Sequence, residues 1–225
     1  MNENWQRTRQ DVVDYCRRLQ AEHLVYYTAG NISARIPGEP NLLAMTPTST
    51  PYDALEPEDI CIVSTSGEIV EARKEPTSEL LMHTLICARR PEVGAVVHTH
   101  GAGVMTMANL GWDLPPILTG LVEAAGGDVR SAPYSKPESA EMADLTADAL
   151  VDRGACFMRF HGLLAVGADL AHAYRTVAVV EGACEVYLRL RQLGDVHLLP
   201  ESEIEWIAEA WKSQFAVPAE SSASS

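Results

Sequence analysis

The sequence predicts a single α/β domain, and three observations lead to that prediction. The chain has 225 residues, the size of one ordinary domain. Its hydrophobic content of 47% and mean hydropathy of −0.04 are typical of a globular protein that buries a full core. Short apolar runs alternate with amphipathic helical segments, and no internal repeat or long linker divides them. We therefore expect one domain at residues 1–215.

The first half of the chain is expected to contain two helices and several short strands. Apolar residues at i, i+3, i+4 and i+7 predict a helix at 3–22. A second helix at 78–89 is closed by Pro91 and leads into a buried strand at 94–98. Between these helices, strands are expected at 32–36, 42–45, 60–64 and 69–70, the last two joined by a Ser66-Gly67 turn.

The second half continues the alternation. A helix at 139–151 precedes an extended run at 155–160, and a long helical pattern fills 170–193 until Gly194 ends it. A last short helix is expected at 201–211. Residues 216–225 read AVPAESSASS, a low-complexity composition that predicts a disordered tail.

Charge and cysteine content exclude several classes of partner. There are 17 Lys and Arg against 31 Asp and Glu, a net charge of −14, which argues against nucleic acid or an anionic membrane as the main partner. No apolar run approaches the roughly 18 residues of a membrane span, and the polar start does not resemble a secretion signal. Five cysteines without CxxC spacing indicate reduced thiols in a cytoplasmic protein.

Three histidines have a spacing that suits a metal. His98 and His100 stand at i and i+2 at the end of a strand, so their rings point to the same side. His161 also ends an apolar strand, before the turn that Gly162 allows. Three imidazoles with an open position form the ligand set of a catalytic Zn²⁺. Satisfied surface histidines would show the same HxH spacing, so the spacing alone leaves both interpretations open.

The segment Thr77-Ser78-Glu79 opens a predicted helix and also has two interpretations. Hydroxyl and acidic residues commonly cap a helix and complement its dipole. The same free N–H groups and hydroxyls can bind a substrate phosphate, with Glu79 beside it as a base. His83, one turn later, either supports that site or packs as a core histidine, which is its more common role.

Two polar turns supply further hydrogen-bond donors. One contains Gly30 and Asn31 and the other Thr48 and Ser49. Turn residues usually only reverse the chain, but Asn31 and Thr48 also suit a phosphate site.

Taken in order, these motifs resemble those of the class II aldolase/adducin family. They are TAGNIS, MTPTSTPYD, EPTSELLMH, AVVHTH and FHGLLAVG. The resemblance covers roughly residues 8 to 213 and is closest to the L-fuculose-1-phosphate aldolases and related deoxypentulose-phosphate aldolases. It implies a three-layer fold, in which helices flank a central, mainly antiparallel sheet. It also implies a cyclic homotetramer with sites at subunit interfaces.

The family's residue roles carry over position by position. The resemblance implies that His98, His100 and His161 bind one Zn²⁺ per subunit, or Co²⁺ or Mn²⁺, and that Glu79 is the catalytic acid/base. The reaction implied is cleavage of a small phosphorylated ketose into dihydroxyacetone phosphate and an aldehyde, with the cation stabilising an enediolate. The phosphate-binding positions are Gly30, Asn31, Thr48, Ser49, Thr77 and Ser78.

The sequence departs from the family pattern near the phosphate and at a proton donor. Ser49 stands where the family has glycine, which adds a side chain beside the anion. Gly120 stands where fuculose-phosphate aldolases carry a tyrosine proton donor. Our hypothesis is that Glu123 or Tyr134 supplies that proton, or that the natural reaction differs from fuculose-phosphate cleavage.

Three alternatives share this family resemblance. Pentulose-phosphate 4-epimerases carry Asp at the position of Glu79, and sugar-acid phosphate decarboxylases carry Lys-Glu where this chain has Ser78-Glu79. Non-catalytic oligomerisation modules, such as the adducin head domain, lose the metal histidines. The residues present therefore favour an aldolase.

Overall fold

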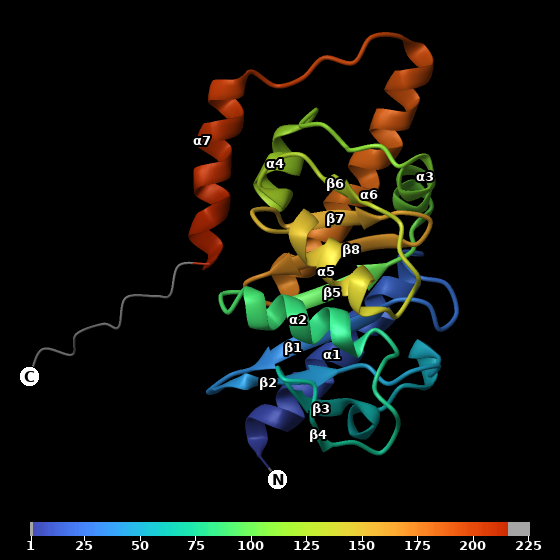
Figure 1. Ribbon diagram of the computed structural model, residues 1–225, viewed down its shortest axis with the longest axis vertical. Coiled ribbons are helices and arrows are strands. Elements are labelled where there is room, and N and C mark those ends of the chain that lie inside the picture. Colours follow the sequence, from blue (N-terminus) through green and yellow to red (C-terminus); the bar gives the residue numbers. More distant parts are fainter. Residues whose placement is uncertain (1, 216–225) are drawn as a thin grey trace, which may run out of the picture.

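The computed structural model describes residues 2–215, and the expected tail at 216–225 lies outside them. Across the described residues, eight strands form one sheet in the order β4-β3-β2-β1-β5-β8-β7-β6 (Figure 1). Every neighbouring pair is antiparallel except β6 and β7, so the mainly antiparallel sheet is confirmed. The strands are β1 (Asn31–Ile36), β2 (Glu39–Met45), β3 (Cys61–Ser64), β4 (Ile69–Glu71), β5 (Ala95–Thr99), β6 (Arg130–Ala132), β7 (Ala155–Met158) and β8 (Gly162–Gly167).

Helices cover both faces of the sheet and complete the three expected layers (Figure 1). One face is covered by α2 and α5, and the other by α1, α3, α4 and α6, with α7 packed on α4. The helices are α1 (Glu3–Ala21), α2 (Leu80–Arg89), α3 (Ala102–Leu110), α4 (Thr119–Ala125), α5 (Ala140–Ala149), α6 (Leu170–Leu193) and α7 (Glu201–Lys212). Within residues 2–215, no helix combines the length and apolar character needed to cross a bilayer.

Successive side chains along each strand point to opposite faces of the sheet, so the hydrophobic core consists of two clusters, one on each face. In β5, Ala95 and Val97 pack with α1 and α6, whereas Val96 packs with α2 and α5. His98 has the parity of Val96, so its ring lies on the α2 face. In β1, Ser33 has the parity opposite to Ile32 and faces the same way. The sheet therefore brings polar side chains from two neighbouring strands beneath the start of α2.

Two local expectations need correction at the site. Helix α2 begins at Leu80 rather than Ser78, so Thr77 and Ser78 lie in the turn that precedes it. The strand expected at 155–160 ends at Met158, and a tight turn leads into β8, which pairs back on it. His161 therefore lies in a hairpin turn rather than at a strand end, because Phe160 adopts the left-handed backbone that the reversal requires (φ 57°).

Four elements were not expected from the sequence, namely α3, α4, β6 and β8. By contrast, α6 has the predicted bounds of 170–193. The remaining predicted helices and strands are present with shifts at their ends.

Candidate active site

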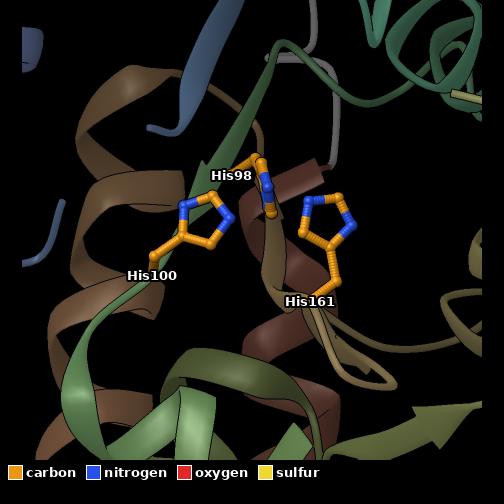
Figure 2. A group of neighbouring side chains, drawn as sticks. All are labelled: His98, His100 and His161. Atoms are coloured by element: carbon orange, nitrogen blue, oxygen red, sulfur yellow. The ribbon is translucent and has the colours of Figure 1, made fainter. Parts of the chain in front are cut away.

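The three predicted histidines form one cluster on the α2 side of the sheet. Their ligand atoms lie within 4.8 Å of one another, and their ring centroids are 4.4 to 5.4 Å apart. Figure 2 shows the rings of His98, His100 and His161 gathered around a common space. His98 and His100 come from the end of β5, and His161 comes from the turn that leads into β8, the neighbour of β5. The predicted convergence of the three imidazoles is thus present.

The hydrogen bonding of His98 leaves one of its nitrogens facing this cluster without a partner. Nδ1 lies 2.8 Å from the carbonyl oxygen of Leu163, which can only accept, so the proton is on Nδ1. Nε2 is buried and has no hydrogen-bond partner. A buried orphan of this kind costs about 1–3 kcal/mol, and the lone pair suits a cation. A histidine that binds a metal through one ring nitrogen usually donates a hydrogen bond from the other nitrogen to a protein acceptor, which fixes its tautomer.

Burial keeps two of the three imidazoles, those of His98 and His100, neutral. Desolvation lowers the pKa of His98 and of His100 well below the usual histidine value, and the neighbouring imidazoles lower both further. Neutral imidazoles present lone pairs rather than charges, so the donor set fits a divalent cation such as Zn²⁺.

Gly162 allows the rings to approach the sheet. A Cβ atom there would lie 2.4 Å from the Thr99 carbonyl oxygen, 3.0 Å from His100 Cδ2 and 3.2 Å from His98 Cε1. Gly30 has a similar role on the other side, where its φ is 84° and a Cβ would lie 2.7 Å from the His98 carbonyl oxygen. The cluster thus depends on two glycines as well as on three histidines.

The Glu79 carboxylate faces the histidines from the start of α2. It is buried at 5% exposure and makes no capping bond, although its residue occupies the N-cap position. Oε1 lies 3.2 Å from His161 Nε2, and Oε2 lies 3.4 Å from His98 Nε2. Asn31 Nδ2 donates a hydrogen bond of 2.9 Å to Oε2. An acid/base group therefore stands directly against the candidate metal centre.

Two loops beside Glu79 are held together by backbone hydrogen bonds. The Thr48 amide donates to the Glu75 carbonyl at 2.9 Å, and the Thr77 amide donates to the Thr46 carbonyl at 3.0 Å. This pairing places the polar residues of both loops at one wall of a cavity of about 230 Å³. The cavity is lined by every predicted metal and phosphate residue and by Glu79, namely Gly30, Asn31, Thr48, Ser49, Thr77, Ser78, Glu79, His98, His100 and His161.

A larger hollow of about 640 Å³ lies beside α1 and is lined in part by Arg7, Asp11 and Arg35. None of the three histidines lines it. The smaller cavity is therefore the candidate active site, because it combines the donor cluster with a buried carboxylate.

Ser49, at a position where the family pattern has glycine, adopts a backbone conformation that favours glycine. Its φ is 51°, in the left-handed region. Its side chain is exposed at the cavity wall, with Oγ 3.4 Å from Thr48 Oγ1. The Ser49 hydroxyl therefore lies at the cavity wall and does not fold back into the core.

Some residues of the site were not identified from the sequence. The cavity is also lined by Pro137 and Glu138, and Glu138 has a φ of 64°. The local sequence Ser-Lys-Pro-Glu-Ser indicates only a loop, so nothing in it points to the site. Ser33 was also overlooked. It is hydrogen-bonded to His83, which in turn bonds Asn31.

The two candidate proton donors lie in different places. Tyr134 is 58% exposed, contacts the ring of Phe160 at 5.8 Å, and lines a small hollow that it shares with His161. Glu123 lies on α4, where it pairs with Arg175 at 3.0 Å and lines a different hollow. Of the two, only Tyr134 lines a hollow that one of the three histidines also lines.

Comparisons with known proteins agree with this geometry. The family model "Class II Aldolase and Adducin N-terminal domain" matches residues 10–188. The chain is 33% identical to the 5-deoxy-D-ribulose 1-phosphate aldolase of Bacillus thuringiensis serovar kurstaki, with 92% of this chain and 96% of that protein covered. It is 35% identical to the 5-methylthioribulose-1-phosphate/5-deoxyribulose-1-phosphate aldolase of Rhodospirillum rubrum, with 91% of each covered. A solved L-fuculose 1-phosphate aldolase superimposes with a TM-score of 0.87 at 30% identity, covering 91% of this chain and 96% of that one.

Proposed function

The chain belongs to the class II aldolase/adducin family, and we propose on that basis that it is a metal-dependent lyase acting on a ketose 1-phosphate. The substrate we propose is fuculose-1-phosphate-like or deoxyribulose-1-phosphate-like, and the products are dihydroxyacetone phosphate and an aldehyde. The observation that carries the proposal is the buried Glu79 carboxylate set against three converging imidazoles. These imidazoles and Glu79 share one cavity with the two polar loops.

The loop wall of the cavity suits the phosphate. Thr48, Ser49 and Ser78 offer hydroxyl groups there, and the N-terminus of α2 adds the partial positive charge of the helix dipole. This attraction is local, because the net charge of −14 would repel an anion at long range. We therefore place the phosphate between residues 48–49 and 77–78.

We place the reacting carbons of the substrate at the side of the cavity that His98, His100 and His161 line. A divalent cation bound there supplies Lewis-acid stabilisation of the negative charge that develops on the substrate oxygens during cleavage. We assign Zn²⁺, with Co²⁺ or Mn²⁺ as alternatives, because three imidazoles form its usual ligand set.

Cleavage requires two proton movements. The bond between C3 and C4 breaks, the C4 hydroxyl loses its proton as C4 becomes the aldehyde carbon, and the bonding electrons pass toward the C2 oxygen. A proton added at C3 then gives dihydroxyacetone phosphate. Glu79 moves the proton at C3, because its carboxylate faces the cluster where C2 and C3 would lie.

We assign the proton of the C4 hydroxyl to Tyr134, because it lines a small hollow together with His161, which also lines the candidate active-site cavity. Tyr134→Phe is expected to lower kcat by about 10²-fold or more without loss of bound metal. Glu123→Gln, which removes the other candidate, is expected to leave kcat unchanged. Steady-state kinetics on both variants checks the assignment, and the opposite result would transfer the role to Glu123 of a neighbouring subunit.

We also propose a homotetramer with sites at subunit interfaces, located in the cytoplasm. Large exposed aromatic side chains beside the site support the interface, namely Tyr27, Tyr134 and Phe160. All five cysteines are buried and free, which suits a reducing compartment. Light scattering on the purified protein tests the tetramer.

The decisive experiment is a panel of ketose 1-phosphates assayed for release of dihydroxyacetone phosphate, with and without a chelator. Activity lost on chelation and restored by Zn²⁺ supports the proposal. Glu79→Gln is expected to keep its metal and lose 10²–10⁴-fold in turnover, because the amide cannot carry the proton. Metal content is measured by elemental analysis of each purified protein.

The exposed variant Glu141→Gln, at the start of α5, provides the matched control and is expected to retain full turnover. Full activity in Glu79→Gln would refute its role. A protein without any bound metal would instead favour a non-catalytic module. Interconversion of epimers, or release of CO₂ from a sugar-acid phosphate, would move the chain to a sister reaction.

A further inference from the structure

His83 is a fully buried polar side chain of α2 whose two ring nitrogens are both hydrogen-bonded. Nδ1 lies 2.7 Å from the Ser33 hydroxyl, and Nε2 lies 2.6 Å from Oδ1 of Asn31. The other side of that amide donates to Glu79, with Nδ2 2.9 Å from Oε2. The four side chains thus form one hydrogen-bonded chain that ends at the catalytic carboxylate.

Two periodicities bring these residues together. Asn31 and Ser33 are two apart in β1 and share a face, while Glu79 and His83 are four apart across the first turn of α2. Each of the three hydrogen bonds therefore joins a residue of β1 to a residue at the start of α2. The chain of hydrogen bonds is continuous over all four residues and uses both ring nitrogens of the histidine.

The direction of each hydrogen bond is fixed by chemistry. Glu79 Oε2 as a carboxylate can only accept, so Asn31 presents its NH₂ to it and its carbonyl oxygen to His83. Nε2 of His83 must then carry the proton that it donates to that oxygen. Burial lowers the pKa of His83 to about 4, so the ring is neutral and Nδ1 accepts from Ser33.

The opposite orientation of the Asn31 amide would leave two oxygens facing each other. Its Oδ1 would lie against Glu79 Oε2, an arrangement without a hydrogen bond. The carboxylate requires the NH₂ of Asn31 on its side, and Nε2–H of His83 donates to the oxygen on the other side. His83 therefore reinforces the orientation in which Asn31 donates to the carboxylate.

We propose that Ser33 and His83 are positioning residues, which act through Asn31 to hold the Glu79 carboxylate with Oε2 engaged and Oε1 directed at the reacting carbon. This inference rests on the proposed function, since it requires Glu79 to move a proton. Residues that position a catalytic group through hydrogen bonds typically contribute 10- to 100-fold.

The first test compares three side chains at position 83 in the metal-loaded enzyme. His83→Met fills a similar volume without polar groups, and its kcat is expected to fall about 10- to 100-fold with little change in KM. His83→Gln keeps an N–H near the position of Nε2 and is expected to recover several-fold over His83→Met. Equal activity in the two variants would show a role in packing alone and would overturn the proposal.

A rise in KM with kcat maintained would also overturn it, because Asn31 would then serve substrate binding. Ile86→Val is the matched control, since it removes a methylene from the same buried helix face and is expected to lower Tm without lowering kcat. Bound metal should remain stoichiometric in all of these variants.

A double-mutant cycle tests the path through Glu79. In the Glu79→Gln background, His83→Met is expected to cause no further loss of turnover, because the group it positions has already been replaced. A loss equal to that in the native background would show an independent role and contradict the proposal.

The tautomer of His83 gives a readout independent of activity. Nitrogen NMR of ¹⁵N-histidine protein, or neutron diffraction, is expected to show the proton on Nε2 and none on Nδ1. A proton on Nδ1 would overturn the stated polarity. Failure of the proposed function is distinguishable, because it would appear as a native protein with the expected tautomer and no cleavage of any ketose phosphate.

Discussion

Gly162 is the residue on which the geometry of the histidine cluster depends most closely. A side chain there would meet the Thr99 carbonyl and the rings of His98 and His100. Gly162→Ala is therefore expected to displace both rings and weaken metal binding by roughly 10- to 100-fold, as loss of ligand orientation does elsewhere. Competition with a chromophoric chelator measures this affinity.

Gly182→Ala is the matched control for that substitution. Gly182 lies in α6, and a Cβ atom there would have no neighbour within 4 Å. Alanine in a helix interior is expected to raise stability by about 0.5–1 kcal/mol with no change in metal affinity. Unaltered metal affinity in Gly162→Ala would show that the rings of His98 and His100 can shift without loss of binding, and it would contradict the role given to Gly162.

Single residues differ in how far the sequence could predict their roles. The pair His98 and His100 is predictable because the period of two in a strand is local. The contact of Glu79 with His161 is not predictable in this way, since it joins the start of a helix to a turn 82 positions later. Ser33 was overlooked because a serine in a strand has no distinctive pattern. Its role arises only from the histidine packed above it.

At the scale of elements, α3 depends on a distant residue for its first turn. The carboxylate of Glu181 in α6 accepts from the Gly103 amide at 2.6 Å and from the Val104 amide at 2.9 Å. No side chain at the N-cap, Gly101, performs this role. Because α3 begins two residues after His100, this contact also secures the end of the segment that carries His98 and His100.

Glu181→Ala is expected to destabilise the protein by about 2 kcal/mol, since it removes both capping bonds and the charge that complements the helix dipole. Urea unfolding measures the loss. Glu185→Ala, one turn later in α6, removes only an exposed pair with Arg189 and is expected to cost under about 0.5 kcal/mol. Equal losses for the two variants would remove the capping argument.

The same contact explains why α3 was not expected from the sequence. Its cap comes from 78 positions away, so the segment lacks the local signal that marks a helix start. In contrast, α6 has its own cap at Asp169, and Gly194 follows its last residue, which made its bounds predictable. The turn before β8 was also hidden, because Phe160 occupies a backbone conformation usually signalled by glycine.

At the scale of the whole molecule, the site lies where one face of the sheet meets the start of helix α2. Neighbouring strands β1, β5 and β8 bring residues 31, 98 and 161 under the start of α2. The family resemblance implied a set of residues, which the structure brings to one cavity, and the three-layer fold, which is confirmed. The mutual orientation of these residues needed the sheet order, which no local pattern contains.

The burial of His83 makes stability depend on pH. The pKa of this ring is lowered to about 4 by desolvation, while in the unfolded chain it is near 6.5. Between these values the unfolded state binds the extra proton, so stability falls as pH decreases from about 6.5 to about 4. The contribution of this one ring reaches ~3 kcal/mol at the acid end and is constant below it.

The measurement is urea unfolding of the metal-free protein from pH 7 to pH 4, in parallel with His83→Gln. His98 and His100 are buried and neutral as well, so both proteins are expected to lose stability on acidification. The native protein should lose more stability than His83→Gln, because only in the native sequence does unfolding expose a buried imidazole that then takes up a proton. The difference between the two curves therefore isolates that ring, and parallel curves would mean that His83 is solvated or charged in the folded protein.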